Sequence, residues 1–245
     1  GYIGSHTVVE FQKNGYDVII ADNLVNSSLD VLDGIEKITG IRPEFEEIDL
    51  TDGEVTRDFF ARHSDIRAVI HFAALKAVGE SVNKPLEYYF NNLNSLMNVL
   101  TCMREFKVPN LVFSSSCTVY GQADVLPVTE KTPRHEAESP YGNTKVMSED
   151  IIRDLMRVEP DMKALALRYF NPIGAHPTAF IGELPNGVPN NLIPYLTQTA
   201  IGIREQLSVF GDDYNTPDGS PLRDYIDVVD LAQAHVVAIR RLLEG

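Results

Sequence analysis

Residues 5–22, Ser5-His-Thr-Val-Val-Glu-Phe-Gln-Lys-Asn-Gly-Tyr-Asp-Val-Ile-Ile-Ala-Asp22, contain the pattern that decides the fold of this chain. The first ten residues have the spacing of an amphipathic helix, with Val8, Val9 and Phe11 on one face. Gly15 is typical of the position just past a helix end. The next six residues are a short apolar, β-branched run that ends at Asp22. The stretch therefore predicts a helix followed by a strand.

The same alternation continues along the chain. Helical patterns cover residues 28–39, 52–63 and 86–106, and another starts near Tyr141, while strand-like apolar runs cover residues 43–48, 67–72, 110–114 and 164–169. Strands that alternate with helices and are mostly apolar throughout indicate a parallel sheet covered on both faces. The predicted fold class is α/β, a doubly wound parallel sheet.

Composition argues against several classes of function. The chain has 35 acidic and 21 basic residues, a formal net charge of -14, which argues against a nucleic-acid or anionic-membrane partner. No apolar run approaches the roughly 20 residues that cross a membrane. Cys102, Cys117 and the six histidines have no metal-type spacing, so we predict no metal and a reduced, cytoplasmic location.

The run Gly1-Tyr2-Ile3-Gly4 stands where a turn enters a helix. Two glycines three apart let the backbone approach a pyrophosphate at the positive end of a helix dipole, although a plain turn also has this pattern. Asp22 ends the next strand, where a carboxylate accepts from a ribose hydroxyl and repels a 2′-phosphate. The pattern predicts NAD as cofactor, unless Asp22 is only a strand-ending turn residue. Asp49, after the following strand, either contacts the adenine or caps a helix.

The composition of the sequence changes after Phe170, and the regular apolar periodicity ends there. Residues 171–191 are rich in Pro, Gly and Asn, and a long irregular stretch of this kind is usually functional or disordered. We then predict a helix over 191–203, a short strand over 207–210, a loop over 211–221 and a last helix over 228–243. The predicted domains are an NAD-binding domain over residues 1–170 and a partial substrate-binding region over 171–245, with segments that return to the first domain.

The run Ser139-Pro140-Tyr141-Gly142-Asn143-Thr144-Lys145 reads as a helix start that places Tyr141 and Lys145 on one face. A tyrosine that acts as a base near neutral pH needs its pKa lowered by roughly three units, on the order of 4 kcal/mol. A nearby lysine ammonium can supply much of that. In isolation such a pair is more often exposed and chemically idle, and the surrounding motifs favour the catalytic interpretation.

Further motifs stand at strand ends, on the edge where such sheets bind ligands. Phe72, Ala73 and Ala74 are followed by Lys76; the small residues let the backbone lie against a flat dinucleotide, and the lysine can meet a pyrophosphate. The run Ser114-Ser115-Ser116 ends the strand ahead of Tyr141. It could be a loop start only, but we favour a hydrogen-bonding function for Ser116.

Six motifs together resemble the UDP-glucose 4-epimerase family, a branch of the extended short-chain dehydrogenases/reductases, along the whole chain. They are Gly1-Tyr-Ile-Gly-Ser-His-Thr7, His71-Phe-Ala-Ala-Leu-Lys-Ala-Val-Gly-Glu-Ser81, Ser114-Ser-Ser-Cys-Thr-Val-Tyr-Gly121, the Tyr141/Lys145 pair, Arg168-Tyr-Phe-Asn-Pro-Ile-Gly-Ala-His-Pro177 and Pro189-Asn-Asn-Leu-Ile-Pro-Tyr195. The later motifs are much more specific than the glycine pair at the start.

The resemblance implies a role for each matching residue. Tyr141 becomes the base, Lys145 the group that lowers its pKa and binds the nicotinamide ribose, and Ser116 the hydroxyl that orients the sugar. The implied cofactor contacts are Gly1, Tyr2, Ile3, Gly4, Asp22, Asn23, Asp49, Leu50, Phe72, Ala73, Ala74, Lys76, Asn91, Ser114, Tyr141, Lys145 and Tyr169. The implied substrate contacts are Ser116, Tyr141, Phe170, Asn171, Asn191, Leu192, Phe210 and Arg223, and the guanidinium of Arg223 suits a pyrophosphate.

The activity implied by the resemblance is the interconversion of UDP-galactose and UDP-glucose through a 4-keto sugar with bound NAD. A related 4,6-dehydratase needs an acidic pair where this chain has Ser116-Cys117-Thr118, so dehydration is disfavoured. Two alternatives stay open: a 4-epimerase of a UDP-N-acetylhexosamine or UDP-pentose, and a non-catalytic nucleotide-binding protein with this fold. The resemblance also implies a homodimer through helices 86–106 and 139–155.

The chain departs from the family pattern at both ends. The family has a strand and a further glycine ahead of Gly1, and more of the substrate domain after Gly245. From these departures we expect residues 1–245 alone to be unstable or free of cofactor.

Overall fold

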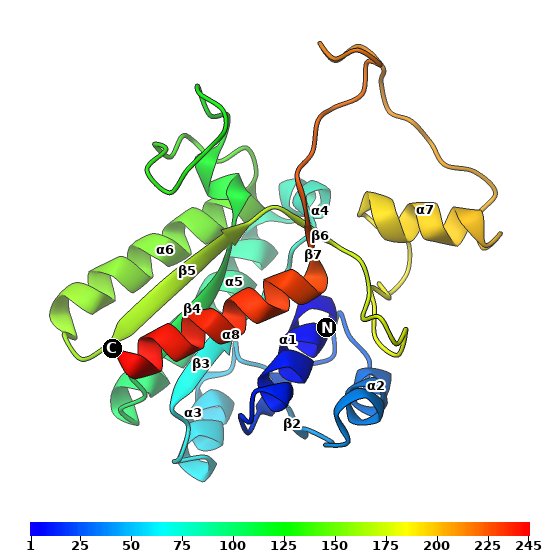
Figure 1. The fold of residues 1–245 in the computed structure, drawn as a ribbon. Coiled ribbons are helices and arrows are strands. Elements are labelled where there is room, and N and C mark those ends of the chain that lie inside the picture. Colours follow the sequence, from blue (N-terminus) through cyan, green and yellow to red (C-terminus); the bar gives the residue numbers. More distant parts are fainter. The chain divides into compact units, whose positions relative to one another are not determined.

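The computed structural model describes all residues from 1 to 245 and shows helices and strands alternating along the chain (Figure 1). The helices are α1 (Tyr2–Lys13), α2 (Asp30–Thr39), α3 (Gly53–Arg62), α4 (Val78–Asn83), α5 (Pro85–Glu105), the short 3-10 helix η1 (Cys117–Tyr120), α6 (Pro140–Val158), α7 (Leu192–Ala200) and α8 (Val228–Glu244). The strands are β1 (Ile19–Asp22), β2 (Glu44–Glu47), β3 (Ala68–His71), β4 (Asn110–Ser116), β5 (Lys163–Tyr169), β6 (Asn171–Ile173) and β7 (Tyr225–Asp227).

Every strand pair in the structure is parallel. β1 pairs with β2, β4 lies between β3 and β5, and β6 pairs with β7. Parallel neighbours require a crossover segment, and here the crossovers contain helices, as the alternating sequence pattern indicates. The predicted α/β class is confirmed.

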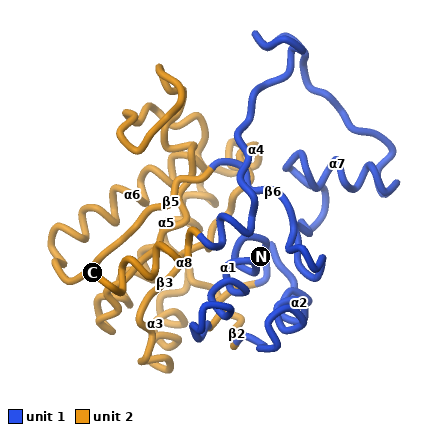
Figure 2. Tube along the Cα trace, viewed as in Figure 1, with its two compact units in different colours: residues 1–18, 24–43, 170–233 blue, residues 19–23, 44–169, 234–245 orange.

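Contacts divide the chain into two compact units, coloured separately in Figure 2. Unit 1 comprises residues 1–18, 24–43 and 170–233, and unit 2 comprises residues 19–23, 44–169 and 234–245. Both units are built from segments far apart in the sequence. The division expected at residue 170 concerns function and stays a prediction.

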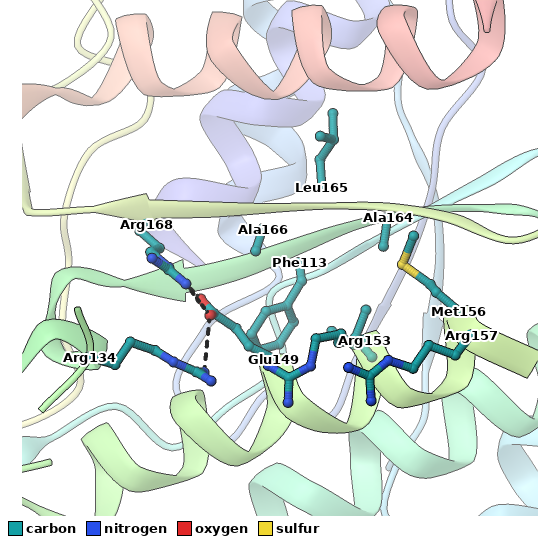
Figure 3. A pocket seen from close by; sticks show the side chains of 11 residues that line it. Phe113, Arg134, Glu149, Arg153, Met156, Arg157, Ala164, Leu165, Ala166 and Arg168 are labelled. Carbon is teal, nitrogen blue, oxygen red and sulfur yellow. Dashed lines mark hydrogen bonds and ion pairs between the residues drawn. The ribbon is translucent and has the colours of Figure 1, made fainter. Parts of the chain in front are cut away.

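The core of unit 2 surrounds β4, whose seven residues are all buried. Leu111 and Phe113 pack in one cluster with Leu96 and Met103 of α5 and with Phe59 of α3. Figure 3 shows β4 and β5 with α6 on one face and, on the other, α8, whose residues 234–244 belong to unit 2. This layering holds the carboxyl end of β4 in a fixed position beside the start of α6.

Unit 1 contains α1 and α2, which pack through fully buried side chains such as Val9 and Ile35. Gly34 of α2 is needed for close approach, because a Cβ there would lie 2.5 Å from the carbonyl oxygen of Phe180. None of the helices combines the length and the hydropathy needed to cross a membrane.

The strand predicted over residues 207–210 is wrong. This stretch has no regular structure, and Phe210 is 91% exposed. Apolar residues alone do not make a strand, and here no partner strand supplies hydrogen bonds. Instead the structure forms β6 and β7, two three-residue strands that the sequence pattern did not reveal.

Candidate active site

The start of α6 has the cap that the sequence predicts. The Ser139 hydroxyl accepts a 3.1 Å hydrogen bond from the backbone N–H of Gly142, and Pro140 occupies the first helical position. Tyr141 and Lys145 follow one turn apart, and the Lys145 Nζ lies 5.8 Å from the centre of the Tyr141 ring. Local cap chemistry therefore fixes Tyr141 and Lys145 on one helix face.

Lys145 is a buried cation, with only 5% of its surface exposed. Its Nζ donates a 2.8 Å hydrogen bond to the backbone carbonyl of Ser114 and lies 5.0 Å from the centre of the Phe113 ring. Burial lowers the pKa of Lys145 to about 8, because the charged form loses its hydration. At neutral pH the group is an ammonium ion.

Ser116 at the end of β4 acts on Tyr141 of α6 through its side chain, in the direction that lowers the pKa of the phenol. The backbone N–H of Thr118 donates to the Ser116 oxygen at 3.2 Å, which leaves the Ser116 proton available for Tyr141. Burial raises the pKa of Tyr141 to about 12; the Ser116 hydrogen bond opposes the rise and the Cys117 thiol adds to it. Burial dominates in the protein alone, so the lowering of this pKa by Lys145 stays a prediction for the ligand-bound site.

Two further strand ends meet beside this pair. The Ser114 hydroxyl hydrogen-bonds to the phenol of Tyr169, and burial raises the pKa of that tyrosine. His71, at the end of β3, is 3% exposed and stacks on Phe113 with a ring separation of 6.1 Å. Burial, and then the charge of Lys145, lower the pKa of His71 to about 3, so its ring is neutral at pH 7.

The segment after β3 holds Phe72, Ala73, Ala74 and Lys76 and has no regular secondary structure. Asn92 of α5 pins it, since the Asn92 side chain accepts from the Leu75 N–H at 2.8 Å and donates to the Leu75 carbonyl at 3.0 Å.

The Asn92 side chain also donates to the hydroxyl of Thr144, next to Lys145, and receives a hydrogen bond from Asn91. Asn91 was predicted as a cofactor contact and stays a prediction, whereas the bonds of Asn92 to Leu75 and Thr144 were not predicted. The available signal was a pair of amides inside an otherwise amphipathic helix.

The adenosine side of the predicted cofactor site lies at the ends of β1 and β2. Asp22 is the last residue of β1 and pairs in register with Glu47, and Asn23 follows it. Asp49 accepts hydrogen bonds from the N–H and hydroxyl of Thr51. It does not cap α3, because Asp52 occupies that position; the helix-cap alternative for Asp49 is therefore wrong.

Leu50 lies next to Asp49, and its carbonyl accepts a 2.9 Å hydrogen bond from Asn98 of α5. A Cβ built on Gly53 would lie 3.2 Å from the same Asn98 side chain, so the turn after β2 lies close against α5. The backbone that is expected to meet the adenine is thus fixed by an amide far away in the sequence.

In unit 1, Gly1 is the N-cap of α1, and Tyr2, Ile3 and Gly4 form the first helical turn. The first N–H groups of a helix have no partner within the helix and carry its positive dipole end. No acidic side chain lies in this turn. The Tyr2 hydroxyl donates to the carbonyl of Gly174 at 2.8 Å, which ties the turn to the segment after β6.

The predicted substrate residues of unit 1 fall into two groups. Asn171 starts β6, and its side chain donates at 3.0 Å to the carbonyl of Asp224, the neighbour of Arg223. Phe170 directly precedes β6. The parallel pairing of β6 with β7 thus brings Asn171 and Arg223 together, although 52 positions separate them.

The second group belongs to α7 and the chain after it. Asn191 is the N-cap of α7 and donates to Glu183 at 2.7 Å, and Leu192, the first residue of the helix, is half exposed. Phe210 projects from the irregular stretch beyond the helix. The structure therefore does not place Phe210 beside the other residues of unit 1 that were predicted for the substrate.

The residues present fit an NAD cofactor. Asp22 stands at a strand end where a ribose hydroxyl can donate to it, and the first turn of α1 offers backbone N–H groups to a phosphate. Lys145 keeps a buried ammonium with a single protein oxygen as hydrogen-bond acceptor, so it has donors left for a ribose.

One group of possible metal ligands lies elsewhere. Ligand atoms of Glu44, Glu46 and His63 lie within 4.8 Å of one another. Glu46 already pairs with both Arg62 and His63, and these hydrogen bonds lower the pKa of its carboxyl. The group is therefore accounted for as an ion-pair cluster on the surface.

Comparison with known proteins identifies the family of the chain. The family model described as the NAD dependent epimerase/dehydratase family matches residues 1–245. The UDP-glucose 4-epimerase of Bacillus subtilis (strain 168) is 53% identical over 245 residues, which cover 100% of this chain and 72% of that protein. The bifunctional protein GAL10 of Pachysolen tannophilus is 53% identical over 246 residues, covering 99% of this chain but 35% of that protein.

A solved structure shows the same fold. The crystal structure of UDP-glucose 4-epimerase from Bifidobacterium longum in complex with NAD+ and UDP matches with a TM-score of 0.95 at 48% identity, over 98% of this chain and 71% of that one. The match over the whole chain confirms the resemblance read from the motifs and the dependence on NAD. The chain belongs to the NAD dependent epimerase/dehydratase family.

Proposed function

We propose that the protein is a UDP-glucose 4-epimerase, which interconverts UDP-galactose and UDP-glucose in galactose metabolism. The observation that carries the proposal is the buried set of Tyr141, Lys145 and Ser116, with no carboxylate in the Ser116-Cys117-Thr118 run that follows β4. A dehydratase needs an acid at that point to eliminate water, whereas an epimerase needs only a reversible base.

Tyr141 takes the proton of the sugar 4-hydroxyl and later returns it. The Ser116 hydroxyl keeps its proton free to donate to the tyrosine oxygen, since its bond with the Thr118 N–H uses only an oxygen lone pair, and donation from Ser116 stabilises the phenolate. A bound NAD, held by residues such as Asp22 and Lys145, would supply reversible hydride transfer at carbon 4 of the sugar. The sugar turns over between the two steps while the UDP part stays anchored, which loose binding of the sugar permits.

The anchoring of UDP is assigned to unit 1. Asn171 at the start of β6 and Arg223, two residues ahead of β7, supply an amide and a guanidinium. Asn191 and Leu192 at the start of α7 add a second amide and an apolar side chain. A guanidinium pairs bidentately with phosphate oxygens. A side-chain amide can both donate hydrogen bonds to a uracil base and accept them from it. These assignments are the substrate part of the proposal, with the NAD part in residues 1–170 and the UDP part in residues 171–245.

We further propose that two copies associate through α5 and α6. Leu86 and Phe90 of α5 are 81% and 63% exposed, and Met97 of α5 and Met147 of α6 are also exposed. A polar change at the centre, Phe90→Asp, is expected to convert a dimer into a monomer, with the molar mass measured by light scattering. An unchanged molar mass would contradict this surface. The location of the protein is proposed to be the cytoplasm.

The proposed activity is tested by supplying UDP-galactose without added NAD and measuring UDP-glucose, using the protein with whatever natural sequence flanks residues 1–245. Conversion would show that NAD is retained and that hydride returns to the sugar. Tyr141→Phe is expected to abolish conversion, and Tyr16→Phe, a change away from the site, to leave it intact. Unchanged conversion by Tyr141→Phe would refute the assigned base, and conversion of only an N-acetylhexosamine or pentose substrate would move the assignment to that sugar.

A further inference from the structure

Glu149 extends the catalytic face of α6 by one more turn. Tyr141, Lys145 and Glu149 are four residues apart, so they lie one above the other on the same side of the helix. The Glu149 side chain is only 8% exposed, which is unusual for a carboxylate. Neither the motifs nor the proposed chemistry assigns a function to this residue.

Four hydrogen bonds and ion pairs hold the Glu149 carboxylate. The Ser115 hydroxyl donates to Oε1 at 2.6 Å, and Arg168 of β5 donates from Nε to Oε1 at 2.8 Å and from Nη2 to Oε2 at 2.6 Å. Arg134 adds an Nη1 contact of 3.6 Å to Oε2. Figure 3 shows this group at one end of a cavity of about 500 Å³ between α6 and β5.

These contacts tie α6 to three consecutive residues of β4. Lys145 donates to the Ser114 carbonyl, Glu149 accepts from the Ser115 hydroxyl, and the Ser116 side chain acts on Tyr141 by lowering its pKa. Arg168 is the register partner of Ser115 on the neighbouring strand. Glu149 therefore joins the catalytic helix to both strands at the level of the reacting groups.

We propose that Glu149 and Arg168 are a positioning pair that holds Tyr141 against Ser116 and thereby sets how readily the tyrosine accepts a proton. A bidentate, charge-assisted pair has a preferred direction. It therefore restrains the position of α6 along the direction of β4 as well as the distance between the helix and the strand. The inference rests on the proposed function, since it names the residues that support its base.

The physical consequence follows from the position of Ser116 relative to Tyr141. The Ser116 side chain lowers the pKa of Tyr141 against the effect of burial, so a shift of α6 along β4 weakens this interaction and the pKa of Tyr141 rises further. Besides Ser116, the groups that face Tyr141 are Lys145 on its own helix, Cys117 on η1, Tyr88 on α5 and Tyr169 on β5. Burial raises the pKa of Tyr88 and of Tyr169, so both phenols are neutral at pH 7 and add no charge that could replace the lost interaction.

A buried ion pair can also be purely structural, and removal of one partner leaves an uncompensated charge. The test therefore compares Glu149→Gln with the double variant Glu149→Gln/Arg168→Met, which removes both charges. The matched control is Asp154→Asn, the same charge change at an exposed position of α6 that pairs with Arg157. In each protein the Tyr141 ring carbon is titrated by ¹³C NMR, and kcat and KM for UDP-galactose are measured across pH.

We expect Glu149→Gln to be less stable than the wild type and the double variant to regain the wild-type stability. In both variants the pKa of Tyr141 should be about one unit higher than in the wild type. One unit is a tenfold smaller phenolate fraction, hence about a tenfold lower kcat on the acid side with little change in KM. Asp154→Asn should match the wild type. If the double variant has the same Tyr141 pKa as the wild type, Glu149 and Arg168 have only a structural role and the proposal is refuted. Because the NMR titration needs no turnover, it decides the inference even if the wild type fails to convert UDP-galactose.

Discussion

Replacing Lys145 with methionine removes the positive charge from the proposed catalytic pair, Tyr141 and Lys145, while keeping a similar side-chain length. In the wild type this charge lies 5.8 Å from the centre of the Tyr141 ring, over which a phenolate spreads its negative charge. The pKa of Lys145, lowered to about 8 by burial, keeps the group charged at pH 7. The variant therefore tests whether the lysine stabilises the base.

The size of the effect follows from Coulomb's law. Two unit charges 5.8 Å apart interact by about 3 kcal/mol at an effective dielectric constant of about 20. At about 1.4 kcal/mol per unit, this raises the Tyr141 pKa by about two units. The phenolate fraction at a fixed pH below that pKa falls about a hundredfold.

The measurement is the initial rate of UDP-glucose formation from UDP-galactose across pH, combined with NMR titration of Tyr141. We expect the acid limb of the kcat profile to move up by about two units in Lys145→Met, with a rate about a hundredfold lower at pH 7. Lys131→Met, at an exposed loop position, is the control and should match the wild type. An acid limb that stays in place, with the rate lost only through weaker NAD binding, would refute the electrostatic reasoning.

Three further predictions concern pH, cofactor and a helix cap. Burial lowers the pKa of His71 from its ordinary value of 6.5 to about 3 in the folded protein. Between pH 6.5 and about pH 3, His71 therefore binds a proton in the unfolded chain but not in the folded one. Stability should fall as pH drops through this window by about 1.4 kcal/mol per unit, and urea unfolding of His71→Leu should show a flatter dependence. Asp22→Asn should reduce the preference for NAD over NADP, measured by competition between the two cofactors. A variant with the same preference as the wild type would contradict the ribose assignment of Asp22. Asp52→Ala removes the acceptor for the N–H groups of Glu54 and Val55 and should cost about 1 kcal/mol in thermal unfolding.

Much of the fold could be predicted from local patterns. The longer helices and the strands from residue 1 to 169 are predicted in the right order because their apolar periodicity repeats over a few neighbouring residues, whereas the short helices α4 and η1 are not predicted. The start of α6 was placed correctly for the same reason: Ser139 caps the N–H of Gly142 three positions on, within the reach of a single turn. The Tyr141/Lys145 pair inherits its geometry from that turn.

Other features of the site depended on residues far apart in the sequence. The short strand expected at 207–210 failed and β7 was missed, because a three-residue strand exists only where a partner, here β6, supplies its hydrogen bonds. Asp49 and Asp52 look alike as helix caps, and only the position of the α3 backbone decides between them.

By itself, the sequence determined the α/β class, the order of the strands and of the longer helices within the first 169 residues, and the pairing of Tyr141 with Lys145 on one helix face. These follow from interactions between residues a turn or a strand apart. The tertiary structure alone decided that Lys145 donates to Ser114, that Asn92 pins the segment after β3, and that Glu149 ties α6 to β4 and β5. Each of these contacts joins residues 17 or more positions apart, which periodicity and cap chemistry do not reach.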